Sequence, residues 1–225
     1  MNKPEAFIFD LNGTMVDDMD FHGKAWYEII HNELGANLSY EEVAKEMYGK
    51  NEEVLARIFG EGKFSPDKIQ YLSIKKEKLY QNAFRPHLQL IKGLGAFLKA
   101  SYEQGIKLAI GSAAIPFNID FVVDALNLKH YFSAVISAED VIKSKPDPET
   151  FVKAAQELNL KPNACIVFED SPKGVEAAQN AGIKCVVITT VHTEEDFGKC
   201  SNILAYIKDY TDPWLKKLLK REVDF

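Results

Sequence analysis

Residues 6–14 read Ala-Phe-Ile-Phe-Asp-Leu-Asn-Gly-Thr, a short apolar run followed by a carboxylate and a turn. The run is continuous rather than alternating, which is typical of a strand buried on both faces of a parallel sheet. Asp10 then stands at the carboxyl end of that strand, where open parallel sheets bind their ligands. Gly13 permits a sharp turn beside it. An aspartate in this position can attack phosphorus and form an aspartyl phosphate, although a simple strand-terminating turn remains the alternative.

Further continuous apolar runs follow along the chain, at residues 107–110, 134–136, 164–168 and 185–188. Helical patterns separate the later runs, at residues 115–126, 148–158 and 172–181. Strands that alternate with helices predict βαβ units with right-handed crossovers. The fold class we expect is therefore α/β, with a doubly wound parallel sheet, Rossmann-like, between layers of helices.

Residues 17–86 break this alternation, because they show helical patterns and no strand pattern. The expected helices are residues 19–34, 39–47, 51–59 and 66–84, and Ser39 and Glu42 have the spacing of a capping box. We predict a core domain formed by residues 1–16 and 87–225 and an all-helical cap domain formed by residues 17–86. An insertion that leaves from the ligand-binding end of a sheet can close over the site as a lid.

The overall charge of the chain restricts its partners. The formal net charge is -6 and the sequence pI is about 5.5. Nucleic acids and anionic membranes both require positive potential, so we expect neither as a partner. Basic residues gather only locally, at Lys75-Lys76 and near the carboxyl terminus. In the second cluster Lys216, Lys217, Lys220 and Arg221 alternate with Trp214, Leu215, Leu218 and Leu219. This alternation predicts an amphipathic terminal helix.

The cysteines and the amino terminus bear on the compartment. Cys165, Cys185 and Cys200 are odd in number and form no C-x-x-C motif, so we expect free thiols in a reducing environment. The apolar run before Asp10 is too short for a signal peptide. No stretch approaches the roughly 18 apolar residues that span a bilayer. We therefore expect a cytoplasmic protein.

Polar side chains follow two further strands. Ser112 comes after the second run, and its hydroxyl and the backbone N–H of Ala113 are suited to bind a phosphoryl oxygen, unless Ser112 is a simple helix N-cap. Lys145 lies in Lys143-Ser144-Lys145-Pro146-Asp147-Pro148. A lysine beside the nucleophile would offset the charge of carboxylate and phosphate, but Lys145 is alternatively a solvated lysine and Lys143 is a rival.

Glu169 and Asp170 end the fourth run. Two hard oxygen ligands beside Asp10 suit Mg²⁺, which prefers few protein carboxylates together with waters and a substrate phosphate. The alternative is helix capping by Asp170 or Ser171, with Pro172 at the first helical position. All these residues fall at one edge of the same predicted sheet. Together they supply a nucleophile, a phosphate hydrogen-bond donor, a cation and a pair of metal ligands.

In this order, the segments resemble the motifs of the haloacid dehalogenase superfamily. The matching segments are Asp10-Leu11-Asn12-Gly13-Thr14, Ser112, Lys145-Pro146-Asp147-Pro148 and Glu169-Asp170-Ser171-Pro172-Lys173-Gly174. The last segment and the helical insertion are similar to the β-phosphoglucomutase-like subfamily. The resemblance implies an enzyme that carries out Mg²⁺-dependent phosphoryl transfer through an aspartyl phosphate, and a chain that is monomeric, as this family often is.

The resemblance also implies residue roles. Asp10 would be the nucleophile and an Mg²⁺ ligand, the backbone carbonyl of Asn12 a second ligand, and Glu169 and Asp170 the remaining protein ligands. Ser112 and Lys145 would hold the transferring phosphoryl group. In the cap, His22 and Lys76 match positions that β-phosphoglucomutases use near the substrate. His22 is equally well read as a polar residue satisfied within the first cap helix.

Asn12 departs from the pattern of the family, which usually has aspartate there as the general acid and base. An amide cannot transfer that proton, and the loss of general acid–base help costs roughly 10²–10⁴-fold in rate. The loss matters most for a poor alkoxide leaving group and less for an acyl, aryl or phosphate leaving group. Asn12 is then an engineered change, a natural residue with the proton supplied by His22 or Asp18, or the mark of a degenerate protein that only binds phosphorylated ligands.

A second departure follows Ser112. β-Phosphoglucomutases grip the second phosphate of a sugar bisphosphate with polar side chains where this chain has Ala114, Ile115 and Pro116. The cap arginine of those enzymes also has no clear match, although Lys50 or Arg57 is a possible substitute. We therefore predict a phosphatase that acts on a small phosphorylated metabolite, such as a sugar phosphate. A β-phosphoglucomutase-type hexose-phosphate mutase is the alternative, and an acid–base-deficient binding protein is the third reading.

Overall fold

A computed structural model describes residues 4–220 and 222–223 of the chain, and the chain divides into two compact units. One unit contains residues 1–17 and 89–225, which we call the core domain, and the other contains Asp18–Leu88, which we call the cap domain. The sequence pattern predicts nearly the same division, with the cap at residues 17–86.

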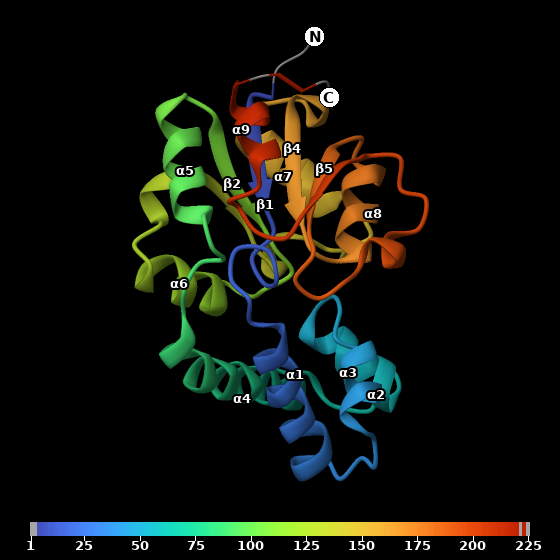
Figure 1. Cartoon of the computed structure of the whole chain (residues 1–225). Coiled ribbons are helices and arrows are strands. Elements are labelled where there is room, and N and C mark those ends of the chain that lie inside the picture. Colours follow the sequence, from blue (N-terminus) through green and yellow to red (C-terminus); the bar gives the residue numbers. More distant parts are fainter. Residues whose placement is uncertain (1–3, 221, 224–225) are drawn as a thin grey trace. The chain divides into compact units, whose positions relative to one another are not determined.

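The core domain is built on a six-stranded parallel sheet in the order β3-β2-β1-β4-β5-β6 (Figure 1). The strands are β1 Ala6–Phe9, β2 Lys107–Gly111, β3 Phe132–Ile136, β4 Cys165–Glu169, β5 Lys184–Ile188 and β6 Ile203–Ile207. This order is that of a doubly wound sheet, so the predicted fold class is confirmed. The sequence pattern does not predict β6. A short 3₁₀ turn at Glu194–Phe197 and irregular chain connect it to β5, so the strand–helix alternation stops before it.

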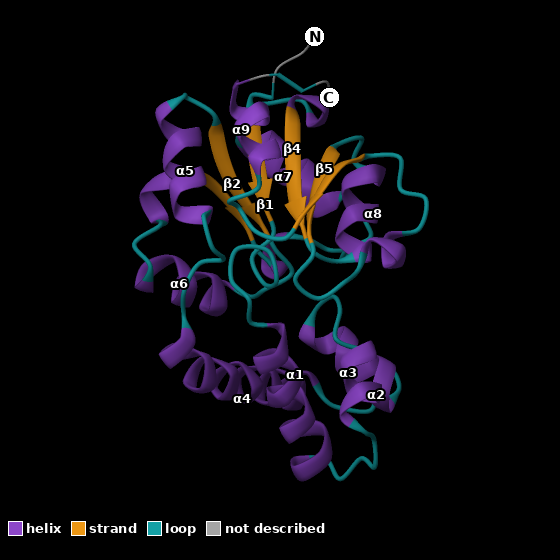
Figure 2. Ribbon diagram, viewed as in Figure 1, coloured by secondary structure: helices purple, strands orange, loops and turns teal. Residues whose placement is uncertain are grey.

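Helices cover both faces of the sheet, as Figure 2 shows for the core domain. They are α5 Leu94–Glu103, α6 Pro116–Ala125, α7 Glu149–Glu157, α8 Pro172–Asn180 and α9 Pro213–Lys220. The helices predicted between strands correspond to α6, α7 and α8, and α5 is an addition to them. The predicted terminal helix corresponds to α9, while Arg221 lies outside the described residues.

Neighbouring residues of the central strands β1 and β4 pack on opposite faces of the sheet, in two different clusters. Ile8 and Val167 pack in a cluster of small and branched side chains that includes Phe151 of α7 and Val175 of α8. Aromatic rings dominate the other face, where the rings of Phe9 and Phe168 stack with centroids 4.7 Å apart and Phe97 of α5 joins them. Both faces of the sheet are therefore buried at the central strands β1 and β4, as the continuous apolar runs predict, whereas Val135 of the edge strand β3 is 44% exposed.

The strand register brings the predicted site residues to one edge. Phe9 of β1 pairs with Ile110 of β2 and with Phe168 of β4. Asp10 and Glu169 thus follow paired residues directly, and Ser112 comes two residues after Ile110. All three lie at the carboxyl ends of adjacent parallel strands, which is where such sheets bind ligands.

The cap domain consists of helices only. They are α1 Met19–Tyr27, which continues as a π-helical segment Glu28–Glu33, α2 Tyr40–Lys45, α3 Asn51–Phe59 and α4 Pro66–Phe84. The capping box is present, because Glu42 N–H donates to Ser39 Oγ at 3.2 Å and Ser39 N–H donates to Glu42 Oε2 at 2.7 Å. The domain has its own apolar core, which includes Trp26, Ile30, Val43, Leu55 and Leu72.

Two other expectations concern the cysteines and the membrane. Cys165, Cys185 and Cys200 are all free thiols, and the first two are buried. Among the described residues, no helix combines the length and the apolar character that crossing a membrane requires.

The turn after β3 gives a pH-dependent test of local stability. The backbone N–H and hydroxyl of Ser137 both donate to Asp140 Oδ2, at 2.7 and 2.6 Å, and these hydrogen bonds lower the pKa of Asp140. A depressed carboxyl pKa stabilises the fold above the unfolded-state pKa of about 3.9, and this contribution is lost as the pH falls through the folded-state value.

We expect Asp140→Asn to lower the free energy of unfolding at pH 7 by roughly 0.5–1 kcal/mol. This is less than a buried hydrogen bond to a charged group contributes, because the Asp140 carboxylate is mostly exposed. The difference from the parent protein should shrink as the pH is lowered from about 5 toward 3. Urea unfolding at several pH values measures it. Asp120→Asn, which removes an exposed carboxylate of α6, controls for the change in net charge. A difference that stays constant with pH would contradict the account.

Candidate active site

The turn after β1, residues 10–16, carries Asp10 and Asn12, and we call it the nucleophile turn. Gly13 N–H donates to the Val16 carbonyl at 2.8 Å, and Met15 N–H donates to the Leu11 carbonyl at 2.8 Å. Gly13 has a φ of 74°, in the left-handed region that favours glycine. A Cβ at this position would lie 2.1 Å from Asp170 Oδ2, so only glycine allows the turn to approach that carboxylate.

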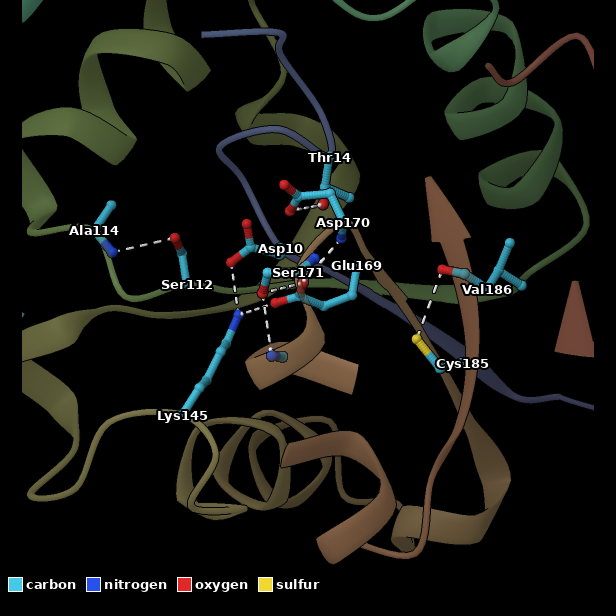
Figure 3. A network of polar contacts seen from close by, with 11 residues as sticks. Asp10, Thr14, Ser112, Ala114, Lys145, Glu169, Asp170, Ser171, Cys185 and Val186 are labelled. Carbon is cyan, nitrogen blue, oxygen red and sulfur yellow. Dashed lines mark hydrogen bonds and ion pairs between the residues drawn. The ribbon is translucent and has the colours of Figure 1, made fainter. Parts of the chain in front are cut away.

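Glu169 and Asp170 are both buried at the end of β4. Thr14 Oγ1 donates to Asp170 Oδ1 at 3.0 Å, which ties the nucleophile turn to this strand end (Figure 3). Glu169 Oε2 accepts hydrogen bonds from Asp170 N–H at 2.9 Å, Ser171 N–H at 2.7 Å and Ser171 Oγ at 2.9 Å. A Cβ on Gly174 would lie 1.7 Å from Glu169 Oε1, so this glycine leaves room for the carboxylate over the start of α8.

Lys145 joins the strand ends as a bridging cation. Its Nζ donates to Asp10 Oδ1 and to Glu169 Oε1, both at 2.7 Å (Figure 3). The same Nζ lies 4.6 Å from the centre of the Phe151 ring. Burial lowers the pKa of Lys145, but the charges of Asp10 and Glu169 outweigh this and raise it above its usual value. The side chain of the rival Lys143 is 73% exposed and lies 3.7 Å from Asp147. The structure therefore brings Lys145, rather than Lys143, to Asp10.

The three carboxylates form a donor set that fits Mg²⁺. One oxygen from each of Asp10, Glu169 and Asp170 can be chosen so that all lie within 4.8 Å of one another. Burial raises the pKa of Asp170 well above its usual value, and the negative charges of Glu169 and Asp10 raise it further. A divalent cation would offset this excess negative charge. A few hard carboxylate oxygens, with remaining positions for water and phosphate, are the ligands that Mg²⁺ prefers.

Ser112 is buried just beyond the end of β2. Its backbone N–H donates to the Ile136 carbonyl at 2.9 Å, and its hydroxyl accepts from Ala114 N–H at 3.2 Å (Figure 3). α6 begins at Pro116 with Ile115 as its N-cap residue, so the reading of Ser112 as a simple N-cap is wrong. Ser171, by contrast, does cap α8, because its hydroxyl accepts from Gly174 N–H at 3.1 Å. Ala113 is half-buried beside Ser112.

His22 and Lys76 meet inside the cap domain. Lys76 Nζ lies 2.7 Å from His22 Nδ1 and donates to both oxygens of Glu77 at 3.1 Å. Burial lowers the pKa of Lys76, and the charge of Glu77 opposes this shift. Tyr80 hydroxyl donates to Asp18 Oδ2 at 2.6 Å, and the rings of Tyr80 and His22 stack with centroids 3.7 Å apart. The predicted pair thus belongs to a buried polar cluster shared by α1 and α4.

Arg57, one of the suggested substitutes for a cap arginine, binds its own domain. Its Nη2 donates to the backbone carbonyls of Glu46, at 2.6 Å, and of Tyr48, and its guanidinium lies 3.6 Å from the centre of the Tyr48 ring. Arg57 therefore anchors the segment between α2 and α3.

Several contacts of the site were not predicted from the sequence. Thr14 belongs to the motif that begins at Asp10, but the sequence alone does not indicate that its hydroxyl binds Asp170. Thr190 and Tyr210 donate to carbonyls of the nucleophile turn and were not predicted at all. For Thr190 a signal was available, because it follows the end of β5. Tyr210 follows β6, a strand that was not predicted.

Comparison with known proteins bears on the family of the chain. The profile of the family described as haloacid dehalogenase-like hydrolase matches residues 7–188. A protein of Haemophilus influenzae is 33% identical over 199 residues, covering 84% of this chain and 93% of its own length. The phosphorylated carbohydrates phosphatase of Thermotoga maritima is 31% identical over 205 residues, covering 85% of this chain and 88% of its own length.

Among solved structures, the β-phosphoglucomutase of Clostridium difficile superposes with a TM-score of 0.83, at 23% identity, over 97% of this chain and 98% of its own. At this identity the superposition supports the fold alone. The family profile spans both the nucleophile turn and the end of β4, which hold the assembled carboxylates. The chain is therefore an enzyme that belongs to the haloacid dehalogenase-like hydrolase family.

Proposed function

We propose that this protein is an Mg²⁺-dependent phosphatase that acts on a small phosphorylated metabolite, in particular a sugar phosphate, through an aspartyl phosphate at Asp10. The observation that carries the proposal is the position of the Asp10 carboxylate. It accepts a hydrogen bond from Lys145 at 2.7 Å and lies in one cluster with the carboxylates of Glu169 and Asp170. A nucleophile, a cation and hard metal ligands are the parts that phosphoryl transfer requires.

In the first step a carboxylate oxygen of Asp10 attacks phosphorus, and the bond from phosphorus to the leaving oxygen breaks. Lys145, the Ser112 hydroxyl and the backbone N–H of Ala113 hold the phosphoryl oxygens during this transfer. Asp10, Glu169, Asp170 and the backbone carbonyl of Asn12 would hold Mg²⁺, which offsets the negative charge between carboxylate and phosphate. In the second step water attacks the phosphorus, and inorganic phosphate leaves with Asp10 restored.

Asn12 limits how fast both steps run. Its amide cannot protonate the leaving oxygen or deprotonate the attacking water, and the usual general acid–base contribution is roughly 10²–10⁴-fold. Turnover should therefore be slow for sugar phosphates, whose leaving group is an alkoxide, and faster for aryl or acyl phosphates. The backbone carbonyl of Asn12 is unaffected by the replacement, so the proposed metal set remains complete.

The proposal favours hydrolysis over mutase chemistry. A mutase must hold a second phosphate while its intermediate reorients, and Ala114, Ile115 and Pro116 offer no side-chain donor for it. Arg57 is already bound to the carbonyls of Glu46 and Tyr48. The Thermotoga maritima relative, which is named as a phosphatase of phosphorylated carbohydrates, supports the substrate class.

For the cap, we propose that His22 and Lys76 contribute to substrate recognition. Their support is the buried cluster in which Lys76 and His22 lie 2.7 Å apart, because a buried cation is costly to maintain for stability alone. We also propose a cytoplasmic monomer whose partner is the phosphorylated metabolite. The acidic balance of the chain, with a net charge of -6, supports the absence of nucleic-acid and membrane partners.

A phosphate-release screen tests the proposal. Purified protein is incubated with Mg²⁺ and a panel of sugar phosphates, together with an activated aryl phosphate. We expect release that a chelator abolishes and added Mg²⁺ restores. Absence of release from every compound would contradict the phosphatase assignment. Conversion of β-glucose 1-phosphate to glucose 6-phosphate, primed by a bisphosphate and without free phosphate, would assign a mutase instead.

A further inference from the structure

Two hydroxyl groups from the carboxyl-terminal part of the core domain hold the nucleophile turn. Thr190 Oγ1 donates to the Gly13 carbonyl at 2.6 Å, and Tyr210 hydroxyl donates to the Thr14 carbonyl at 3.1 Å. Gly13 and Thr14 are consecutive residues. They lie between Asn12, whose carbonyl is a proposed metal ligand, and Val16, whose carbonyl accepts a hydrogen bond from Gly13 N–H. The turn is therefore fixed from outside as well as by its own hydrogen bonds.

The two donors reach the turn from the far half of the sheet. Thr190 follows β5 and Tyr210 follows β6, and the strand order β3-β2-β1-β4-β5-β6 places β4 between them and β1. Glu169 and Asp170 lie at the end of β4. Hydrogen bonds that run from the β5 and β6 ends to the turn after β1 consequently hold that turn across the end of β4.

The contacts continue from the donors to Asp170. Tyr210 binds the carbonyl of Thr14, and the hydroxyl of the same Thr14 donates to Asp170 Oδ1 at 3.0 Å. Thr190 binds the carbonyl of Gly13, whose α-carbon approaches Asp170 so closely that an added Cβ would lie 2.1 Å from Oδ2. A single residue of the nucleophile turn thus stands between each hydroxyl and the Asp170 carboxylate. That residue is Gly13 for Thr190 and Thr14 for Tyr210.

Tyr210 is itself held rigidly. Its backbone N–H donates to the Lys92 carbonyl at 2.9 Å, and its ring lies 5.8 Å from Phe97 and 5.9 Å from Phe168, centre to centre. Burial raises the pKa of Tyr210 well above its usual value, so the hydroxyl stays protonated and remains a donor. Because these contacts hold the Tyr210 side chain in place, its hydroxyl can fix the position of the Thr14 carbonyl.

We propose that Thr190 and Tyr210 are positioning residues for the metal and phosphoryl site. They set the position of the Asn12 carbonyl and the Asp10 carboxylate, which come from the β1 end, relative to Asp170, which comes from the β4 end. This inference rests on the proposed function for its catalytic consequence, whereas its consequence for Mg²⁺ binding is independent of the substrate. Neither side chain is expected to touch the phosphoryl group.

Thr190→Val and Tyr210→Phe remove each hydroxyl while keeping the shape of the side chain. We expect each to weaken Mg²⁺ binding by roughly 10-fold, the lower end of what loss of an outer hydrogen bond costs a metal site. Isothermal titration calorimetry of Mg²⁺, without substrate, measures this directly. Amides of Met15 and Val16 should also exchange faster with solvent in the metal-free variants, because the turn opens more easily. Thr190→Ser, which restores the hydroxyl, should return Mg²⁺ affinity toward that of the parent protein.

Each variant has a matched control: Thr189 directly precedes Thr190, and Tyr206 lies in β6, before Tyr210. Thr189 has a hydroxyl that donates to the Ile207 carbonyl at 3.3 Å, and Tyr206 is a half-buried tyrosine whose ring lies 5.8 Å from Phe197. Thr189→Val and Tyr206→Phe should leave Mg²⁺ affinity unchanged. At saturating Mg²⁺, kcat should fall in Thr190→Val and Tyr210→Phe with little change in KM, because positioning acts on the chemical step.

Mg²⁺ affinity that is unchanged in both variants, or that falls equally in the controls, would overturn the inference. If Tyr210→Phe does not fold, the Thr190→Val and Thr190→Ser pair gives the same decision. A parent protein that releases no phosphate but shows the expected loss of Mg²⁺ affinity in the variants would overturn the proposed function and support the positioning role. The two claims therefore fail separately.

Discussion

Asp10→Asn is expected to reduce Mg²⁺-dependent phosphate release by roughly 10⁴-fold or more, a loss of the size that follows removal of a catalytic nucleophile. The amide keeps the shape of the side chain but cannot attack phosphorus. It also weakens the ion pair in which Lys145 Nζ lies 2.7 Å from Asp10 Oδ1. Steady-state phosphate release, measured with the best compound of the screen, gives the ratio.

Lys143→Met is the matched control for this change, because Lys143 is a largely exposed lysine outside the carboxylate cluster. It should release phosphate at the rate of the parent protein. Thermal unfolding of Asp10→Asn without metal establishes that the variant is folded. Substantial activity in folded Asp10→Asn would mean that phosphoryl transfer does not pass through Asp10, and the proposed mechanism would be wrong.

Asn12→Asp is expected to raise kcat by roughly 10²–10⁴-fold, because it restores a carboxyl group at the position from which the family transfers the proton. The gain should be larger for a sugar phosphate than for an aryl phosphate, since the alkoxide is the leaving group that most needs a proton. Parallel measurement of kcat with both substrates tests this dependence on the leaving group.

Asn12→Ala provides the matched control, because it removes the amide without adding an acid and should not increase kcat. The intact mass of the parent protein must also be checked, since an asparagine followed by Gly13 can lose ammonia and become aspartate. Equal rates in Asn12→Asp and the parent protein would show that another group already supplies the proton, or that the site is inactive. The activity of Asp10→Asn separates these cases.

Much of the fold was predictable because its signals are local. Runs such as residues 6–9 and 164–168 are continuous and apolar, which distinguishes buried parallel strands from half-exposed ones. β6 was missed because an irregular connection with only a 3₁₀ turn leads into it, so the alternation of strands and helices does not extend that far. The cap helices were predicted from their periodicity, although the π-helical segment Glu28–Glu33 was not, since no local pattern marks it.

The site residues also divide into those that the sequence predicts and those that depend on how the chain folds. Asp10, Ser112, Glu169 and Asp170 could be predicted because strand ends in a parallel sheet meet at one edge. The choice between Lys143 and Lys145 could not, because it depends on which side chain the packing directs inward. Thr190 and Tyr210 lie 177 and 196 residues from the carbonyls that they bind. Contacts between such distant positions appear only when the chain is folded.

The most direct test of the central claim is to detect the phosphoryl group on Asp10. The parent protein is mixed with Mg²⁺ and an aryl phosphate, quenched in acid, digested, and the peptides are analysed by mass spectrometry. Because Asn12 cannot activate the attacking water, we predict that a phosphorylated Asp10 accumulates, only in the presence of Mg²⁺ and never in Asp10→Asn. Sustained phosphate release with no phosphoryl group on Asp10, or with one on another residue, would contradict the account.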